Sequence, residues 1–293
     1  MKTRLFILYL ISIILLLIVL SGINGCPQQQ PKISTTGLKM SFVKDAPPVS
    51  VITGTEFPIY VDVLNAGGEF VNKGSAKFYL SNLGPNFENV KSSLINEKTL
   101  GKESVFPERL VFAEKAKFTF PLQDMLVVPL VLTGCYDYSG RAQASVCITG
   151  SNESKVCKID GEKIISNTAG PIQITSVTES ISRNKLILIF EVANKGNGQV
   201  YLADADCDKL EARDITESQK QGKLNIKITT KDNFKCKLQS SSGQVDGLEG
   251  IAPLGKIICE KDISKEDYLS VFIIETRYKY RDSIIQNINI MPA

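Results

Sequence analysis

Seven cysteines carry the chemistry that is easiest to interpret in this chain of 293 residues. A thiol can form a disulfide, bind a metal, act as a nucleophile or carry a lipid. The sequence contains no histidine, so it cannot build a Ser-His-Asp triad, a Cys-His dyad or a histidine-ligated zinc site. No Cys-x-x-Cys spacing occurs. Lipid attachment and disulfides are therefore the expected uses of these thiols.

Cys26 follows an apolar N-terminal segment and is the candidate for lipid attachment. Two basic residues precede the apolar run Leu5–Leu20, which is the order of an export signal. The residues Ile23–Cys26 resemble a lipobox, with an aliphatic residue three positions before the cysteine. Alternatively, the segment stays uncleaved, because as a helix rising about 1.5 Å per residue it would cross the roughly 30 Å core of a bilayer. Both interpretations predict a membrane tether and an extracytoplasmic location.

The other six cysteines form an even set, which in an exported chain predicts disulfides. They are Cys135, Cys147, Cys157, Cys207, Cys236 and Cys259. We expect Cys135 to pair with Cys147 across a hairpin that turns near residues 139–143, because the two side chains would then face each other on adjacent strands. The next expected pairs are Cys236 with Cys259 and Cys157 with Cys207.

Three aspartates at alternate positions, Asp204, Asp206 and Asp208, are the candidate for a metal site. Carboxylates with this spacing on a strand or loop can converge on a hard cation such as calcium. An EF-hand loop is not formed, because Lys209 and Ile215 stand where that loop needs glycine and glutamate. The alternative, which the sequence favours, is a solvated acidic loop.

The run Arg277–Arg281 alternates cations with tyrosines. As a strand it would place its three cations on one face and Tyr278 and Tyr280 on the other. One interpretation is contact with an anionic glycan, a lipid headgroup or an acidic protein. The alternative, favoured by the pattern, is a strand whose tyrosines face the core and whose charges face water and discourage edge pairing.

Asn152 begins the single Asn-x-Ser/Thr sequence of the chain and is the candidate for glycosylation. It lies between the two domains predicted below, where a glycan would fit. The sequence has no Gly-x-Ser-x-Gly motif, P-loop or dinucleotide-binding glycine pattern. We therefore expect no enzymatic activity and no cofactor.

Apolar residues that alternate with a period near two predict that the exported part is all-β. The clearest runs are Phe57–Val63, Ala76–Leu80, Ala116–Phe120 and Lys223–Thr229. Turn-forming residues separate such runs at intervals of about ten, the spacing of a β-sandwich. Helix signals are few, and residues 89–96 and 208–220 predict loops or short helices.

An internal repeat divides the exported part in two. Val63–Gly67 and Val192–Gly196 share the pattern Val-x-Asn-x-Gly, and each ends an alternating apolar run. Asn tolerates a left-handed backbone and Gly admits positive φ, so the pattern predicts a turn where a strand leaves its sheet. The predicted parts are a tether at 1–26, a polar spacer at 27–36, a first sandwich at 37–150, a linker at 151–169 and a second sandwich at 170–293.

The Val-x-Asn-x-Gly strand end, in both copies, is similar to the CARDB type of immunoglobulin-like domain of prokaryotic, and especially archaeal, surface proteins. The segment Cys135–Tyr138, followed by Ser145–Ile148, resembles the end of the first domain in anchored archaeal surface proteins of that kind. The resemblance implies two tandem immunoglobulin-like β-sandwich domains on a cell surface, with adhesion or partner binding as their association. It supplies no catalytic residues.

These features predict a membrane-tethered extracytoplasmic surface protein that acts as a non-catalytic interaction, adhesion or envelope structural module. The expected partners are the membrane, through the N-terminal segment or its lipid, and an envelope protein or glycan. The net charge of +3 supplies no basic field for nucleic acid. The alternative is a solute-binding lipoprotein of a transport system, which would need two α/β lobes around a cleft and hence long helical patterns.

Overall fold

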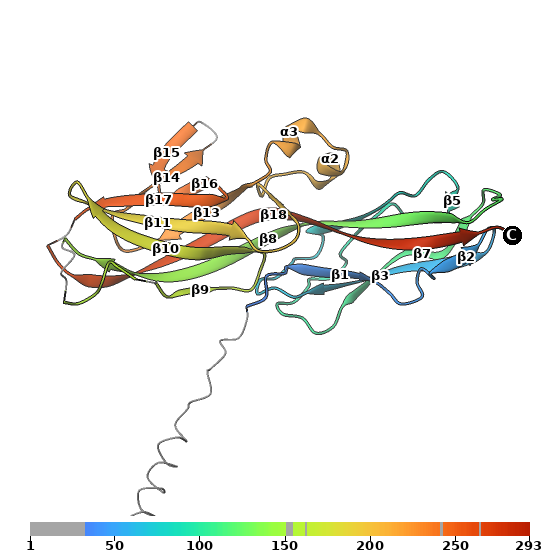
Figure 1. Ribbon diagram of the computed structural model, residues 1–293, viewed down its shortest axis with the longest axis horizontal. Coiled ribbons are helices and arrows are strands. Elements are labelled where there is room, and N and C mark those ends of the chain that lie inside the picture. The colour runs from blue at the N-terminus through green and yellow to red at the C-terminus, as the bar shows by residue number, and fades with distance from the viewer. Residues whose placement is uncertain (1–32, 151–154, 162, 241–242, 264) are drawn as a thin grey trace, which may run out of the picture. The chain divides into compact units, whose positions relative to one another are not determined.

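The computed structural model describes residues 33–150, 155–161, 163–240, 243–263 and 265–293. The protein is all-β, with 58% strand and 4% helix, and its sheets pack in a sandwich-like arrangement (Figure 1). The expected fold class is confirmed at this level. The helical lobes that a solute-binding lipoprotein would need are not found among the described residues.

Two of the predicted features, lipid attachment at Cys26 and glycosylation at Asn152, lie outside the described residues. Within the part of the chain that the structure describes, no helix has the length and apolar character needed to cross a membrane. Residues 33–293 form one compact unit.

In the described part of the chain, eight strands precede residue 150. They are β1 (Leu38–Phe42), β2 (Ser50–Ile52), β3 (Glu56–Asn65), β4 (Ala76–Ser81), β5 (Phe87–Glu88), β6 (Ser93–Ile95), β7 (Glu108–Phe118) and β8 (Leu126–Ile148). The segment expected as loop or helix at 89–96 thus contains β6 and loops.

The remaining strands and two short helices follow. They are β9 (Ile165–Asn167), β10 (Ile172–Ser182), β11 (Lys185–Asn194), β12 (Gln199–Tyr201), α2 (Cys207–Glu211), α3 (Ile215–Ser218), β13 (Lys223–Thr229), β14 (Lys235–Ser240), β15 (Gly243–Gly247), β16 (Glu249–Pro253), β17 (Gly255–Asp262) and β18 (Tyr268–Met291). The short helices α2 and α3 agree with the helix signal at 208–220.

Alternation of buried and exposed residues places the core as the sequence predicts. In β3, Phe57, Ile59, Val61 and Val63 are buried while the residues between them are partly exposed. Because successive side chains of a strand point to opposite faces, this alternation directs one apolar row into the sandwich. β13 follows the same rule.

Two long strands connect the two halves of the fold. β8 and β18 pair antiparallel without interruption, from Tyr268 opposite Ile148 to Ile290 opposite Leu126. At about 3.4 Å per residue, this ladder extends for roughly 75 Å. We call it the β8–β18 ladder.

Each half of the fold combines strands of its own with part of the β8–β18 ladder. The first half contains two sheets. One has the strand order β1-β3-β7-β5. The other is the sheet of the β8–β18 ladder, to which β2, β4 and β6 also belong. In the second half, β10, β11, β17, β14, β16 and β13 follow in order to β18. The last residues of β18 pair with β2, so the C-terminus lies beside β2 (Figure 1). This pairing crosses the boundary expected near residues 151–169.

The hairpin expected at 139–143 is wrong, because β8 runs straight through these residues. Ser139 and Gly140 look like turn residues in the sequence, but both lie within β8, and Gly140 allows a close approach of the side chain of Thr276. A β-carbon on Gly140 would lie 3.0 Å from the hydroxyl of Thr276 on the neighbouring strand, and that hydroxyl donates to the Gly140 carbonyl at 3.3 Å.

All six cysteines outside the N-terminal segment form disulfides, but only one expected pair is confirmed. Cys236 is bonded to Cys259. The expected pairs Cys135–Cys147 and Cys157–Cys207 are wrong, since Cys135 is bonded to Cys207 and Cys147 to Cys157. Without the hairpin, Cys135 and Cys147 lie far apart along one strand and cannot meet.

Candidate functional site

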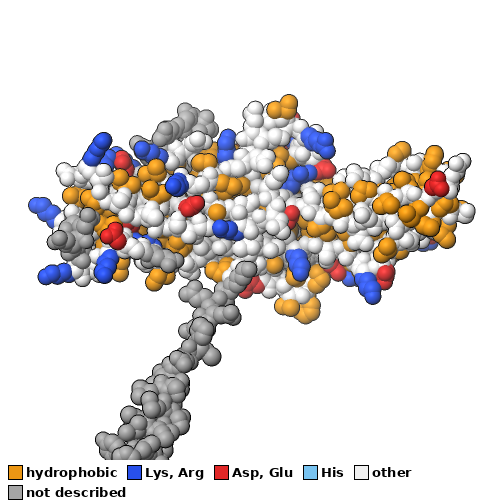
Figure 2. Space-filling view, viewed as in Figure 1, with side chains coloured by type: hydrophobic (Ala, Val, Ile, Leu, Met, Phe, Trp, Pro, Cys, Tyr) orange, Lys and Arg blue, Asp and Glu red, His pale blue; other side chains and the backbone are white. Residues whose placement is uncertain are grey.

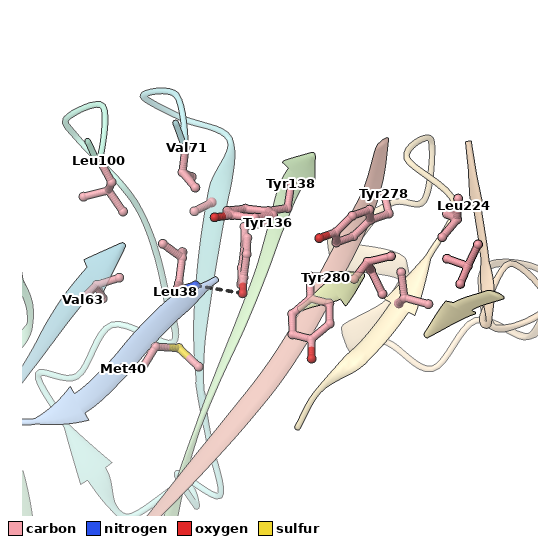
Figure 3. Packing of buried hydrophobic residues seen from close by; sticks show 14 of the residues in the cluster. Leu38, Met40, Val63, Val71, Leu100, Tyr136, Tyr138, Leu224, Tyr278 and Tyr280 are labelled. Atoms are coloured by element: carbon pink, nitrogen blue, oxygen red, sulfur yellow. Dashed lines mark hydrogen bonds between the residues drawn. The ribbon is translucent and has the colours of Figure 1, made fainter. Parts of the chain in front are cut away.

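Four tyrosines meet at the middle of the β8–β18 ladder. Tyr136 lies opposite Tyr280 and Tyr138 opposite Tyr278, with ring centroids 5.8 Å and 6.1 Å apart (Figure 3). All four are buried. Burial raises the pKa of Tyr138 to about 12 and also raises the pKa values of Tyr136, Tyr278 and Tyr280. The four hydroxyls therefore stay protonated at physiological pH. We call this group the tyrosine centre.

The two copies of the Val-x-Asn-x-Gly repeat end at the tyrosine centre. The side-chain oxygen of Asn194 accepts from the Tyr280 hydroxyl at 3.2 Å and from the Gly196 amide at 3.1 Å. In the first copy, the oxygen of Asn65 accepts from the Tyr138 hydroxyl at 3.5 Å and from the amide two residues later at 3.1 Å. The repeat thus marks two equivalent loops, each held by one tyrosine.

The first described residues also cross the tyrosine centre. The Tyr136 hydroxyl accepts from the Leu38 amide at 3.0 Å, the bond drawn in Figure 3. The carbonyl of Ser34 accepts from the Gly170 amide at 2.9 Å, and the carbonyl of Gly37 accepts from the Ala66 amide at 2.9 Å. The segment Ser34–Leu38 is therefore held at the middle of the ladder.

The segment with α2 and α3 is fastened beside the tyrosine centre. Its Cys207 is bonded to Cys135 of β8. Asp208 accepts from the Lys77 ammonium at 2.5 Å and from the Tyr79 hydroxyl at 2.8 Å, both on β4. The bonds from Lys77 and Tyr79 lower the pKa of the Asp208 carboxyl. A segment of the second half is thus held against a strand of the first.

The three aspartates proposed for calcium serve separate purposes. Asp206 caps the N-terminus of α2 by accepting from the amides of Asp208 and Lys209. Asp204 lies 3.4 Å from the Lys220 ammonium. In the described parts of the chain, no group of three or more His, Cys, Asp and Glu residues could hold a metal ion.

The tyrosines and the cations of Arg277–Arg281 lie on opposite faces of β18, as the favoured interpretation of the sequence predicts. Its two tyrosines are buried and its three cations face outward. Arg281 bonds Glu211 of α2 at 2.6 Å, and Lys279 lies 3.0 Å from Asp137 on β8. Arg277 is exposed, and no carboxylate lies within ion-pair distance of it among the residues described. Of the three cations in this run, Arg277 is therefore the one without an ion pair to a described residue.

A hollow of about 360 Å³ opens in front of this cation. We call it the central hollow. It is lined by Phe70, Asn72, Ser75, Asp137, Tyr138, Ser139, Ala203, Arg277 and Tyr278. Its volume falls within the range of about 300–1,000 Å³ that is usual for ligand sites.

Phe70 gives the central hollow an exposed aromatic ring. The residue is 57% exposed, and the Lys102 ammonium lies 5.1 Å from the centre of its ring. Arg277 can donate two parallel hydrogen bonds to a planar anion, while Asn72 and Ser75 can exchange hydrogen bonds with hydroxyl groups. The central hollow therefore suits a ligand that combines hydroxyls, an apolar face and a negative charge.

The sequence identified Arg277 as a candidate contact but missed Phe70, Asn72 and Asp137. Phe70 and Asn72 follow the first Asn-x-Gly loop, so the repeat was the signal that could have found them. Asp137 could not be predicted from the sequence, because its position opposite Lys279 depends on the pairing of β8 with β18.

No family model matches the chain, and no curated protein matches it. Among the solved structures with some similarity is the secreted serine protease VesC from Vibrio cholerae, at 9% sequence identity and a TM-score of 0.20. That match covers 83% of this chain and 50% of the protease chain, so the chain spans about half of its length. At this TM-score, the likeness supports no inference about fold or activity.

Proposed function

We propose that this chain is a membrane-tethered, extracytoplasmic interaction module that binds an anionic glycan of the cell envelope and catalyses no reaction. The observation that carries the proposal is the central hollow, where the Arg277 side chain, which forms no ion pair with the described carboxylates, lies together with the exposed ring of Phe70. A guanidinium suits a carboxylate or sulfate group, because its fork of donors matches two oxygens. An aromatic ring offers apolar area to the nonpolar face of a sugar.

The proposed location is supported by covalent structure. Three disulfides indicate an oxidising environment outside the cytoplasm. The tether expected at residues 1–26 would join the body through the segment Ser34–Leu38 at the middle of the β8–β18 ladder.

We also propose that the two sandwich-like halves are immunoglobulin-like domains of the CARDB type. Support comes from the matched loops at Asn65 and Asn194, in which the same side-chain oxygen accepts from a tyrosine and from the amide two residues later. The strands β8 and β18 each run through both halves, so the halves differ from two independent domains in series.

Binding to isolated envelopes tests the proposed function. The full-length chain in mild detergent is sedimented with envelope material, and binding is compared for the wild type and for the double variant Phe70→Ser with Arg277→Ser. We expect binding to weaken at least about tenfold, equivalent to about 1.4 kcal/mol.

The matched control is Phe106→Ser with Arg183→Ser, which removes the same residue types from exposed positions that do not line the central hollow. It should bind as the wild type does. Removal of envelope carbohydrate should abolish the binding of both the wild type and this control variant. Equal binding by the two double variants would contradict the proposed site, and binding to stripped envelopes would contradict the glycan.

A further inference from the structure

The three most exposed large hydrophobic side chains among the described residues lie on two segments near the start of the described chain. They are Phe106 and Ile164, each 85% exposed, and Val105, 81% exposed. Single exposed apolar residues are normal on a protein surface, so exposure alone indicates nothing. Their position is informative, because both segments adjoin Ser34–Leu38, through which the expected tether would join the body. We call Val105–Pro107 the apolar tip.

The apolar tip is connected to Ser34–Leu38 through the first Asn-x-Gly loop. The Asn65 carbonyl accepts from the Ser104 amide at 2.8 Å. The amide of the next residue in the loop, Ala66, donates to the Gly37 carbonyl at 2.9 Å. The apolar tip begins directly after Ser104, so it lies beside the first described residues.

Hydrogen bonds hold the apolar tip in this exposed position. The Ser104 hydroxyl donates to the Phe106 carbonyl at 3.0 Å. The Glu103 amide donates to the Gly67 carbonyl at 2.8 Å, and Pro107 restricts its own φ. Turning the apolar side chains inward would break these contacts. The fold therefore presents the two side chains outward from a fixed loop.

Two cations that flank the apolar tip are already paired. The Lys102 ammonium lies 3.0 Å from a carboxylate oxygen of Glu69, and the Arg109 guanidinium lies 2.9 Å from one of Asp62. A charge next to an apolar phase is costly when it has no partner. The tip can therefore approach such a phase without leaving either cation unpaired.

Ile164 lies on the second segment that adjoins Ser34–Leu38. It directly precedes β9, and the Gly170 amide, which follows β9, donates to the Ser34 carbonyl at 2.9 Å. At about 3.4 Å per residue, Ile164 is within about 20 Å of this bond. In Figure 1, β9 and the first described residues lie along the lower edge of the body, and Figure 2 shows hydrophobic side chains on that edge.

We propose that the apolar tip and Ile164 enter the surface of the lipid bilayer, so that this edge of the body rests on the membrane. The inference depends on the tether of the proposed function. From a tether that ends at Gly25 or Cys26, the chain reaches at most about 29 Å to Ile33, in any conformation. This short reach raises the effective concentration of lipid at the edge, so a few apolar side chains suffice for contact.

Tryptophan fluorescence tests this contact, because the chain contains no tryptophan. The full-length variant Phe106→Trp is reconstituted into phosphatidylcholine vesicles with or without bromine on the acyl chains, which quenches a nearby indole. We expect the brominated lipid to remove most of the emission. Addition of Val105→Asp should restore the emission, because a carboxylate on the apolar tip opposes entry into an apolar phase.

Phe120→Trp is the matched control. Phe106 precedes β7, whereas Phe120 follows the other end of this strand and is 53% exposed. The eleven residues of β7 separate the two positions by roughly 35 Å. Brominated lipid should leave the emission from position 120 unchanged.

Vesicle flotation separates this inference from the proposed function. Loss of flotation would contradict the tether, and the membrane contact with it. Flotation without quenching at position 106, or equal quenching at positions 106 and 120, would overturn the membrane contact alone. The vesicles hold no carbohydrate, so glycan binding is tested independently. In the envelope assay, the detergent micelle around the tether would cover the apolar tip, so Phe106→Ser remains a suitable control there.

Discussion

A β-carbon at position 67 would lie 1.7 Å from the hydroxyl oxygen of Tyr138, and one at position 196 would lie 2.3 Å from that of Tyr280. The sequence suggested that these glycines serve a positive φ, but neither has one in the structure. Their role is to let a loop approach a tyrosine. The repeat was therefore correctly detected, while its local physical cause was not.

Substitution of either glycine tests this cause. We expect Gly67→Ala and Gly196→Ala each to lower the free energy of unfolding by about 1–3 kcal/mol, because the tyrosine must move within a packed core. Chemical denaturation measures the difference. Gly84→Ala is the control, since no heavy atom lies within 4 Å of its β-carbon position, and it should change stability by under about 0.5 kcal/mol. Equal effects at all three positions would contradict the steric explanation.

Asp232 is a buried carboxylate held by three donors in the second half. It accepts from the Lys261 ammonium at 2.8 Å, from the Ser270 hydroxyl at 2.5 Å and from the Tyr268 hydroxyl. Burial alone would raise the pKa of the carboxyl, but these donors outweigh it and lower the pKa. The carboxylate therefore stabilises the fold above the unfolded pKa of about 3.9, and this contribution is lost as the pH falls through the lower folded value.

Removal of this charge should make stability less dependent on pH. Asp232→Asn leaves the Lys261 ammonium without its partner, so we expect a loss of about 3 kcal/mol at pH 7. The difference from the wild type should shrink as the pH falls below about 4, because the Asp232 carboxyl of the unfolded wild-type chain becomes protonated there while that of the folded chain is protonated only at lower pH. Denaturant unfolding at a series of pH values measures both. A difference that stays constant down to pH 3 would show that the charge is not responsible.

Among the elements, short strands with local alternation could be predicted from the sequence. β3, β4 and β13 lie where the apolar pattern placed them, because one buried row in a strand leaves a visible period of two. β8 and β18 could not be predicted as continuous, because their length depends on a partner strand far away in sequence. Gly140 illustrates the ambiguity, since the same residue type can mark a turn or a close approach.

The disulfides follow the same division between local and long-range information. Cys236 and Cys259 lie on directly paired strands, and this pair was predicted. Cys135–Cys207 fastens the α2–α3 segment to β8, and its position could not be known before the ladder was. The central hollow could not be predicted from the sequence either, because Phe70, Asp137 and Arg277 come together only through strand pairing.

Loss of Cys135–Cys207 should destabilise the protein more than loss of Cys147–Cys157. The two pairs span 72 and 10 residues, and restriction of the unfolded chain predicts losses of about 4 and about 3 kcal/mol respectively. Chemical denaturation of the two double alanine variants measures the difference. Peptide mapping without reduction checks the pairing itself, and a Cys135–Cys147 peptide would contradict it.

At the scale of the whole molecule, the two halves are built as one body. Buried apolar residues of both halves belong to one large core cluster that includes the tyrosine centre, and the α2–α3 segment is fastened to both β4 and β8. Such a body keeps Phe70 and Arg277 at a fixed separation, so the central hollow is formed before a ligand arrives. A preformed site loses less conformational entropy on binding.

The central claim is that the hollow contacts an envelope glycan on living cells. The most direct measurement places a photoreactive aromatic amino acid at position 70, irradiates intact cells and analyses the crosslinked products by mass spectrometry. The same amino acid at position 106, also an exposed phenylalanine, is the control. We predict a carbohydrate-bearing product from position 70 that is absent from position 106 and is lost with Arg277→Ser. No such product from position 70, or equal products from both positions, would contradict the claim.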